Sequence, residues 1–359
     1  MTAVTIIAEA GVNHNGRLDL ALALVDAAAD AGADVVKFQT FRADQLVTPA
    51  ASKADYQIRN TGEANSQLEM LKALELDDAA HRELIAHCGR RGIAFLSTPF
   101  DSLSLGLLTE GLGLKRLKVG SGDLTNAPIL LEMARRGSAV ILSTGMATMD
   151  EIEESLGVLA FGYTGGKEPG RAAFRSAFAS EQGRAALRQN VTLLHCTSDY
   201  PAIPDEINLK AMDTLAAAFG LPVGFSDHSE GIAIAIAAVG RGAVMIEKHL
   251  TLDRKMPGPD HVASIEPDDF TAMVSGIRLV ERALGDGRKV PMPSELKTIP
   301  IARKSLVARR TIRRGEHFST DTLTVKRPGT GVSPVFYWEY LGRAASRDYQ
   351  AEDVISERP

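Results

Sequence analysis

Eight apolar segments that can form β-strands, each followed by a helix or a helical insert, constrain the fold of this chain more than any other feature. The predicted strands are residues 5–11, 34–40, 93–99, 116–122, 139–145, 191–198, 222–227 and 244–250. The predicted helices are residues 18–31, 77–91, 102–110, 127–136, 150–159, 209–219, 230–242 and 267–284. Eight regular strand–helix repeats are typical of a closed parallel barrel rather than of an open doubly wound sheet. We therefore predict a (β/α)8 TIM barrel over residues 1–285.

Two inserts and a C-terminal segment with a different sequence pattern complete the predicted organisation. Residues 44–76 are polar and suit a lid or a dimer contact over the barrel mouth, with plain decoration as an equal alternative. Residues 162–190 are expected to be a surface excursion. Residues 286–300 form a charged linker with spaced prolines, and residues 301–359 show short β-type runs without a helical period. We predict a small second domain there.

Composition excludes several classes of protein. The net charge is −5, the sequence pI is about 6.0, and no long Lys/Arg run occurs, which argues against a nucleic-acid or membrane binder. No apolar run reaches about 18 residues, and the first residues do not resemble a signal peptide. Cys88 and Cys196 lack the spacing of a disulfide framework or a thiolate zinc site. A cytoplasmic protein is expected.

Two histidines close the last two predicted strands. If these strands are parallel neighbours, His228 and His249 lie side by side at the carboxyl ends, where barrels bind ligands. Strand alternation puts Ser226 on the face of His228, and Glu247 on the face of His249. Neutral imidazoles with oxygen ligands and no thiolate suit Mn²⁺, Mg²⁺, Co²⁺ or Zn²⁺ with open coordination positions. The alternative for either histidine alone is an ordinary hydrogen-bonding role.

The other predicted strands also end in polar side chains. These are Glu9, Lys37, Thr98, Lys118, Ser121, Ser143, Ser198 and Tyr200. Charged side chains inside apolar strands are costly unless they pair with each other or with a ligand. Two lysines, several hydroxyls and the glycines of KVGSG and LSTG suit a phosphate, although one Ser/Thr–Gly turn alone is a weak signal. A phosphate-bearing ligand beside a metal is the interpretation that these residues favour.

Eleven motifs in order resemble the sialic acid synthase family over essentially the whole chain. They are IIAEAGVNHNG, DVVKFQTF, ADYQIRNTGEANSQLEMLKALEL, FLSTPFD, KVGSGD, ILSTGMAT, LLHCTSDYP, GFSDHSEG, IEKHLTLD, PGPDH and KRPGTGVSP. The C-terminal part resembles the antifreeze-like domain of these enzymes. The resemblance implies condensation of phosphoenolpyruvate and water with the open-chain aldehyde of N-acetylmannosamine, giving N-acetylneuraminate and phosphate with C–O cleavage.

The resemblance also implies a role for each motif residue. Phosphoenolpyruvate would be bound by Thr98, Lys118, Ser121, Ser143, Ser198 and Ser226. His228 and His249 would bind a divalent metal, usually Mn²⁺, and would form the catalytic set with Lys37 and with Glu9 as acid/base. Tyr200, Glu247 and Asp260 would position the sugar together with Lys37. Arg327 would reach the sugar's N-acyl group in the other subunit of a domain-swapped homodimer.

Several alternatives remain open at this point. The same reaction on a 2,4-diacetamido-trideoxyhexose would give N,N'-diacetyllegionaminate or pseudaminate, and only loops around Tyr200 and the 44–76 insert would then differ. Lys37 or Lys118 could instead form a Schiff base, as in a class I aldolase. Related barrels that make other keto-sugar acids use sugar phosphates and lack the KRPGTG domain. A non-catalytic carbohydrate- or ice-binding protein would leave the polar strand ends unexplained.

Overall fold

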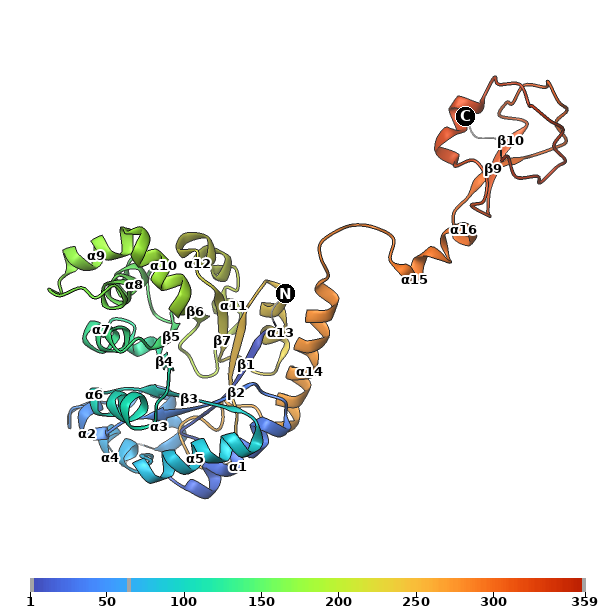
Figure 1. Cartoon of the computed structure of the whole chain (residues 1–359). Helices are drawn as coiled ribbons and strands as arrows, with labels where there is room; N and C mark the ends of the chain where they lie inside the picture. The colour runs from blue at the N-terminus through green and yellow to red at the C-terminus, as the bar shows by residue number, and fades with distance from the viewer. Residues whose placement is uncertain (1–2, 63–65, 357–359) are drawn as a thin grey trace. The chain divides into compact units, whose positions relative to one another are not determined.

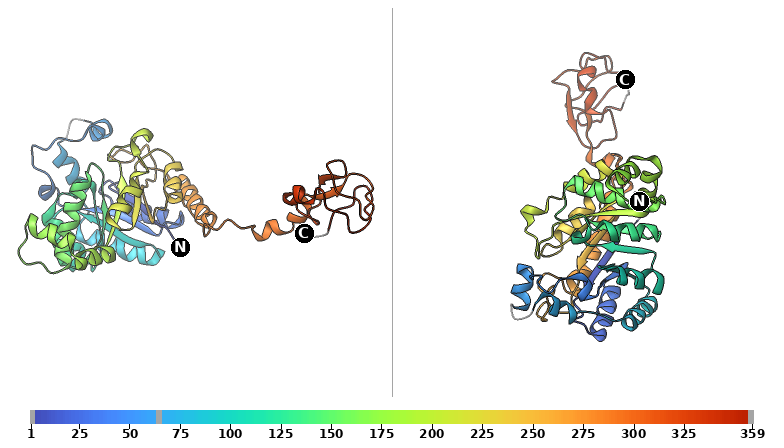
Figure 2. Two further views of the ribbon diagram at one scale, coloured as in Figure 1. Left: turned by 90° about the horizontal axis from the view of Figure 1, so that it is seen from above. Right: turned by 90° about the vertical axis from the view of Figure 1, so that its left-hand side faces the viewer.

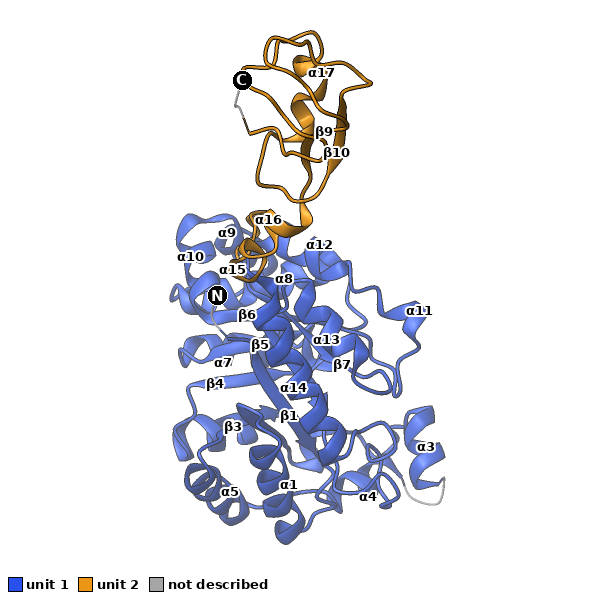
Figure 3. Ribbon diagram, turned by 90° about the vertical axis from the view of Figure 1, so that its right-hand side faces the viewer, with its two compact units in different colours: residues 1–285 blue, residues 286–359 orange. Residues whose placement is uncertain are grey.

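The computed structural model describes residues 3–62 and 66–356 and divides the chain into two compact units (Figure 1). The first unit comprises residues 1–285 and the second residues 286–359 (Figure 3). Residues 63–65, inside the long motif of the first insert, lie outside the described residues. Each unit has its own hydrophobic core.

The first unit is built on eight parallel strands. They are β1 (Thr5–Gly11), β2 (Val35–Thr40), β3 (Ala94–Pro99), β4 (Arg116–Val119), β5 (Ala139–Ser143), β6 (Val191–Cys196), β7 (Val223–Asp227) and β8 (Met245–His249). Hydrogen bonds join them in the order β3-β2-β1-β8-β7-β6-β5-β4, so β1 pairs with both β2 and β8. β3 and β4 are adjacent without a ladder between the described residues. The predicted TIM-type barrel is confirmed.

Helices follow the strands and cover the outside of the barrel (Figures 1 and 2). They are α1 (Leu18–Asp30), α5 (Asp78–Arg91), α6 (Ser102–Gly106), α7 (Ala127–Arg135), α8 (Met149–Tyr163), α12 (Ala211–Phe219), α13 (Ala233–Gly240) and α14 (Pro267–Leu284). In α14, Phe270, Met273, Val274 and Ile277 are buried. This i, i+3, i+4, i+7 spacing gives the helix one apolar stripe, which packs against α13 and α1.

The main differences from the sequence-based elements lie at the ends of strands. β4 ends at Val119, and Ser121–Asp123 then form a short 3-10 helix, η2. β5 and β6 each end two residues before the predicted boundary. The predicted helix over 102–110 becomes α6 and a π-helical turn, η1 (Leu107–Gly111), where Thr109 Oγ1 donates to Leu105 O. Such side-chain donors compete with the regular helical ladder.

The two inserts form short helices. The first contains α2 (Ala43–Leu46), α3 (Asp55–Thr61) and α4 (Gln67–Lys72), and the second contains α9 (Arg171–Ala179) and α10 (Glu181–Asn190). Asn60 at the end of α3 donates to Pro259 O in the loop after β8, at 2.6 Å. Phe174 of α9 packs against Phe161 of α8, with ring centroids 5.2 Å apart. The first insert therefore reaches the carboxyl ends of the strands, whereas the second packs on an outer helix.

The second unit is a small β-rich domain. After α15 (Pro293–Leu296) and α16 (Ile299–Ala302), β9 (Ser305–Ala308) pairs antiparallel with β10 (Leu323–Lys326). The turn η3 (Pro334–Phe336) and α17 (Tyr337–Tyr340) follow. Its core consists of Leu306, Ala308, Ile312, Phe318, Leu323, Val332, Tyr340, Ala345, Tyr349 and Ile355. Across the described parts of both units, every helix is too short or too polar to span a bilayer.

Candidate active site

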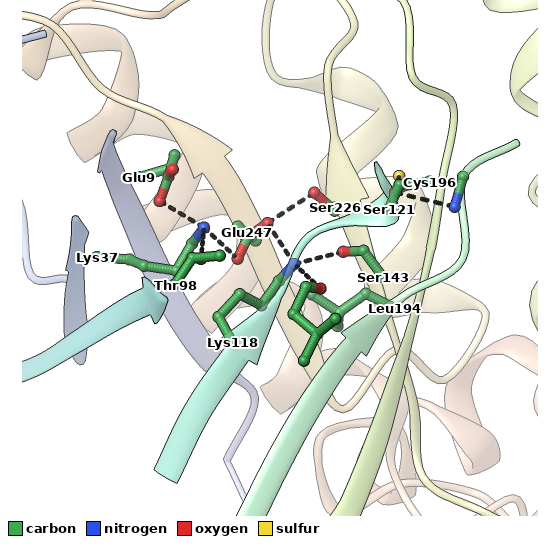
Figure 4. A network of polar contacts seen from close by, with 12 residues as sticks. Glu9, Lys37, Thr98, Lys118, Ser121, Ser143, Leu194, Cys196, Ser226 and Glu247 are labelled. Carbon is green, nitrogen blue, oxygen red and sulfur yellow. Dashed lines mark hydrogen bonds and ion pairs between the residues drawn. The ribbon is translucent and has the colours of Figure 1, made fainter. Parts of the chain in front are cut away.

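A buried polar network occupies the carboxyl ends of the barrel strands (Figure 4). Glu247 of β8 lies at its centre, where its Oε1 atom accepts a hydrogen bond from Ser226 Oγ at 2.8 Å. Lys118 Nζ lies 3.7 Å from Oε1, and Lys37 Nζ lies 3.4 Å from Oε2. Burial by itself would raise the pKa of Glu247, but Lys118 and Lys37 outweigh this effect and hold the pKa at about 2. Glu247 is thus an anion shared by two lysines.

Lys37 links this carboxylate to a second one on β1. Its Nζ atom lies 2.8 Å from Glu9 Oε2 and donates to Thr98 Oγ1 at 3.4 Å. Burial would lower the pKa of Lys37, but the charges of Glu247 and Glu9 raise it. Burial raises the pKa of Glu9, with Glu247 adding to the effect and Lys37 opposing it. Glu9 is therefore the carboxyl group of the pair that is better suited to exchange a proton near neutral pH.

Lys118 is the second buried cation of the network. Its Nζ atom donates to Ser143 Oγ at 2.6 Å and to Val119 O at 2.9 Å. Burial lowers its pKa and Glu247 opposes the decrease. An anionic ligand beside this ammonium would replace water and favour its charged form. Lys118 is consequently a cation that is poised to bind an anion.

Three polar side chains meet at Gly145, which follows β5 and has no side chain of its own. β5 is paired with β4, the strand of Lys118. A β-carbon at Gly145 would lie 2.3 Å from Ser198 Oγ and 2.8 Å from both Cys196 Sγ and Ser121 Oγ. Gly145 N donates to Ser121 Oγ at 3.1 Å, and Ser121 Oγ lies 3.1 Å from Cys196 Sγ. No larger residue fits there without displacing these groups. The loops after β4, β5 and β6 thus form a compact group of small donors, as a phosphate requires.

The two histidines lie next to each other, as expected if the last two strands are parallel neighbours. Their ring centroids are 5.6 Å apart, and β7 pairs with β8 in a register that sets Ser226 opposite Glu247. His228 Nδ1 donates to Thr197 O at 2.7 Å, which leaves Nε2 with its lone pair, whereas His249 Nδ1 is buried without a hydrogen-bond partner. Burial lowers the pKa of both imidazoles, so both are neutral at pH 7.

These two imidazoles fit a divalent metal with open coordination positions. The unpartnered nitrogen of His249 and the oriented ring of His228 are the features expected of ligands. Within the described residues no cluster of three or more His, Cys, Asp or Glu side chains is arranged to hold a metal. His228 and His249 are the residues that would hold such a metal.

An aromatic residue and an acid complete this end of the barrel. The Tyr200 ring lies 4.3 Å from His228 and 5.7 Å from His249, measured between centroids. Asp260, in the loop after β8, is 7% exposed, and burial followed by the charge of Glu9 raises its pKa to about 7. A carboxyl group with this pKa can hold or release a proton beside the site at neutral pH.

Arg327 belongs to the second unit, whereas the other predicted site residues belong to the first. It is exposed, and its Nε atom donates to Ala302 O at 3.0 Å. The remaining predicted residues, all in the barrel unit, are Glu9, Lys37, Thr98, Lys118, Ser121, Ser143, Ser198, Tyr200, Ser226, His228, Glu247, His249 and Asp260. They gather at the strand ends described above.

The sequence-based selection missed a buried ion pair behind the histidines. Asp227 and Lys248 are paired in the β7–β8 register and point away from the barrel interior. Lys248 Nζ lies 2.8 Å from Asp227 Oδ2 and donates to Ser229 O at 2.8 Å. The sequence does indicate this pair. Each residue directly precedes one of the histidines in an apolar strand, and a buried charge in such a strand requires a partner of opposite charge. Cys196 was missed because it was considered only as a thiolate ligand or disulfide partner.

Comparison with known proteins shows the family to which this chain belongs. A profile of the NeuB family matches residues 24–289, and a profile of the SAF domain matches residues 303–357. The N,N'-diacetyllegionaminic acid synthase of Campylobacter jejuni is 50% identical over 357 residues, covering 99% of this chain and 100% of that protein. The synthase of the same name from Legionella pneumophila is 44% identical, covering 98% and 92%.

A solved structure shares both sequence and fold with this chain. The N-acetylneuraminic acid synthetase of Leptospira borgpetersenii, solved in complex with citrate, is 34% identical with a TM-score of 0.66. The similarity covers 83% of this chain and 90% of that protein. The chain therefore belongs to the NeuB family of enzymes and carries a C-terminal SAF domain, which confirms its resemblance to the sialic acid synthases.

Proposed function

We propose that this enzyme condenses phosphoenolpyruvate and water with a 2,4-diacetamido-trideoxyhexose to give N,N'-diacetyllegionaminate and phosphate. The observation that carries the reaction class is the Glu9–Lys37–Glu247–Lys118 network beside two adjacent neutral histidines. The names of the two relatives above support the diacetamido sugar. N-acetylmannosamine, which was the first expectation from the sequence, becomes the second candidate.

Phosphoenolpyruvate binds through its two anionic groups. Lys118 contacts one of them by a charge-assisted hydrogen bond, and Ser143, already 2.6 Å from Lys118 Nζ, supports the same anion. Ser121 and Ser198 donate to the phosphate oxygens near Gly145. Thr98 of β3 and Ser226 of β7 also bind this substrate. Thr98 accepts a hydrogen bond from Lys37, and Ser226 donates one to Glu247. For the reaction to occur, the C3 carbon of the bound substrate must face the aldehyde carbon of the sugar.

His228 and His249 hold the divalent metal, for which Mn²⁺ is the first candidate and Mg²⁺ or Co²⁺ are the others. When bound, such a cation supplies Lewis acidity that polarises the sugar's aldehyde carbonyl. Tyr200, whose ring lies against His228, and Asp260, in the loop after β8, orient the sugar. The imidazoles need no deprotonation at neutral pH, because burial already lowers their pKa values.

Glu9 moves the protons of the reaction. Phosphoenolpyruvate C3 attacks the aldehyde carbon, and Glu9 gives a proton to the aldehyde oxygen as the C–C bond forms. Water then adds at C2 and returns a proton to the Glu9 carboxylate. The C–O bond to phosphate breaks last: the proton of the new C2 hydroxyl passes to the departing phosphate oxygen, and C2 becomes the ketone of a 2-keto acid. Lys37, which lies 2.8 Å from Glu9, stabilises its anionic form between the two transfers.

The test measures phosphate release and identifies the product. We expect purified enzyme with Mn²⁺, phosphoenolpyruvate and the diacetamido sugar to release one phosphate per nine-carbon acid formed, with lower kcat/KM for N-acetylmannosamine. Phosphoenolpyruvate labelled with ¹⁸O at its bridging oxygen should deliver the label to phosphate, because the C–O bond breaks. Label in the sugar acid would exclude this mechanism, and release with neither sugar would exclude the proposed function.

The second unit supplies Arg327 to the site of another copy in a homodimer. Residues 286–359 contain 14 Lys and Arg against 9 Asp and Glu, a net charge of +5, whereas residues 1–285 contain 26 against 36, a net charge of −10. Opposite net charges favour docking of the small unit on a barrel. The 16 residues Gly285–Pro300 would span about 50 Å if fully extended, and the turns α15 and α16 shorten this reach.

Mixing two inactive variants tests this assignment. Arg327→Ala and His228→Ala are each expected to abolish most activity as homodimers. If Arg327 acts on the partner's barrel, a mixed dimer contains one site with both defects and one with neither, so activity should return toward half of the wild-type value. Native mass spectrometry verifies subunit exchange. Mixed dimers without recovered activity would show that the domain serves its own barrel.

A further inference from the structure

The first insert places a second tyrosine beside Tyr200. Tyr56 of α3 stacks against Tyr200 with ring centroids 5.0 Å apart and a 34° angle between planes. Tyr200 in turn lies 4.3 Å from His228. The three rings therefore form a continuous aromatic row, which starts at the histidine pair and ends in the insert. Tyr56 forms the end of this row opposite to His228.

One hydrogen bond ties α3 to the loop after β8, and a second closes the insert around α3. Asn60 donates to Pro259 O at 2.6 Å, next to Asp260, whereas Lys53, before α3, donates to Gly62 O, after α3, at 2.9 Å. Burial and then the charge of Asp260 raise the pKa of Tyr56, so its phenol stays neutral. α3 buries no residue completely, and Tyr56 is half-buried. The contact of Asn60 with the loop after β8 and the packing of Tyr56 on Tyr200 therefore join this helix to the site.

The row of rings faces the part of the sugar that differs between the candidate substrates. In the proposed function the aldehyde carbon lies at the histidines, so the sugar's far carbons extend away from them along Tyr200. The diacetamido sugar carries an acetamido group at carbon 4 and a methyl at carbon 6, whereas N-acetylmannosamine carries hydroxyl and hydroxymethyl groups there. Both differences add methyl groups, which bind favourably against aromatic faces.

We propose that Tyr56 is a specificity-determining residue, whose ring selects sugars with methyl-bearing groups at carbons 4 and 6. This inference rests on the proposed function and names how the same site would choose its sugar. It also gives the 44–76 insert a role beyond decoration, since the insert would carry the selecting ring over the barrel mouth. A hydrophobic contact of one or two methyl groups typically discriminates about tenfold to a few hundredfold.

The test compares Tyr56→Ala, Tyr56→Phe and Tyr56→Leu with wild type, using both sugars at saturating phosphoenolpyruvate. We expect Tyr56→Ala to lower kcat/KM for the diacetamido sugar at least about tenfold and that for N-acetylmannosamine less than about threefold. The KM for phosphoenolpyruvate should stay within twofold. Tyr56→Phe should keep the wild-type preference, and Tyr56→Leu part of it. Arg59→Ala, an exposed change on the same helix, is the matched control and should alter neither sugar.

The outcomes separate this inference from the proposed function. The ratio of the two sugars in wild type tests the proposed substrate, and the change of that ratio in Tyr56→Ala tests Tyr56. Equal losses with both sugars, or a parallel rise in the KM for phosphoenolpyruvate, would show a structural role and overturn the inference. A Tyr56→Phe variant that loses the preference would overturn selection by the ring. If wild type uses neither sugar, both proposals fail.

Discussion

Replacing His249 by alanine is expected to reduce turnover by at least about a thousandfold, since loss of Lewis-acid catalysis removes several kcal/mol of transition-state stabilisation. His228→Ala should behave alike. His249 Nδ1 has no hydrogen-bond partner, so its removal leaves no protein group unsatisfied and the thermal midpoint should change little. The affinity for Mn²⁺, measured by electron paramagnetic resonance, should fall together with turnover, and EDTA should inactivate wild type reversibly.

A histidine on the same sheet provides the control for this experiment. His195 of β6 bonds to Ile207 O at 2.6 Å, away from the histidine pair. His195→Gln should therefore retain Mn²⁺ affinity and most of the activity. Full turnover by metal-stripped wild type, or unchanged Mn²⁺ affinity in His249→Ala, would refute the metal assignment.

Lys118→Ala is expected to raise the KM for phosphoenolpyruvate by about tenfold or more and to lower kcat/KM by about a hundredfold. The variant loses a charge-assisted contact, which is worth about 1.5–3 kcal/mol in binding. It also removes one of the two lysines of the network that contact Glu247 and leaves Lys37. The negative charge of Glu247 is then less compensated and repels the anionic substrate. Steady-state kinetics with varied phosphoenolpyruvate give both values.

Lys248 is the matched control, because it is also a buried strand lysine but faces away from the network. Lys248→Ala breaks its pair with Asp227, and breaking a buried ion pair costs about 3–5 kcal/mol of stability. We expect a lower thermal midpoint with an unchanged KM for phosphoenolpyruvate. Equal kinetic effects of the two substitutions would contradict a specific role of Lys118.

Borohydride distinguishes this chemistry from that of a Schiff-base aldolase. No covalent adduct should form with either substrate present, since Lys37 is held between two carboxylates and its pKa is raised, which disfavours the nucleophilic amine. An adduct mapped to Lys37 or Lys118 would support the alternative that the sequence left open.

Much of the site could be predicted because strand alternation has a period of two. Once 222–227 and 244–250 are recognised as parallel neighbours, Ser226 and His228 must share a face with Glu247 and His249. The barrel follows from the number of repeats, and a parallel barrel brings all its strand ends to one rim. The resemblance to a known family then named the substrates, which periodicity and composition alone leave undetermined.

Other features depended on packing between segments that are distant in the sequence. Cys196, Ser121 and Ser198 meet at Gly145 because three loops approach the place where that residue lacks a side chain. Tyr56 contacts Tyr200, and Asn60 of the same helix contacts the loop after β8, although these segments are far apart in the sequence.

The sequence by itself determined the order of the elements, the inward faces of the strands and the polar residues at their ends. These depend on local periodicity and on the cost of burying charge, both of which can be read along the chain. The tertiary structure decided which lysine contacts which carboxylate, and therefore which carboxyl group keeps a raised pKa. Glu9 and Glu247 are both buried strand glutamates, and they differ because Glu247 forms ion pairs with Lys37 and Lys118, whereas among the described residues Glu9 forms an ion pair with Lys37 alone.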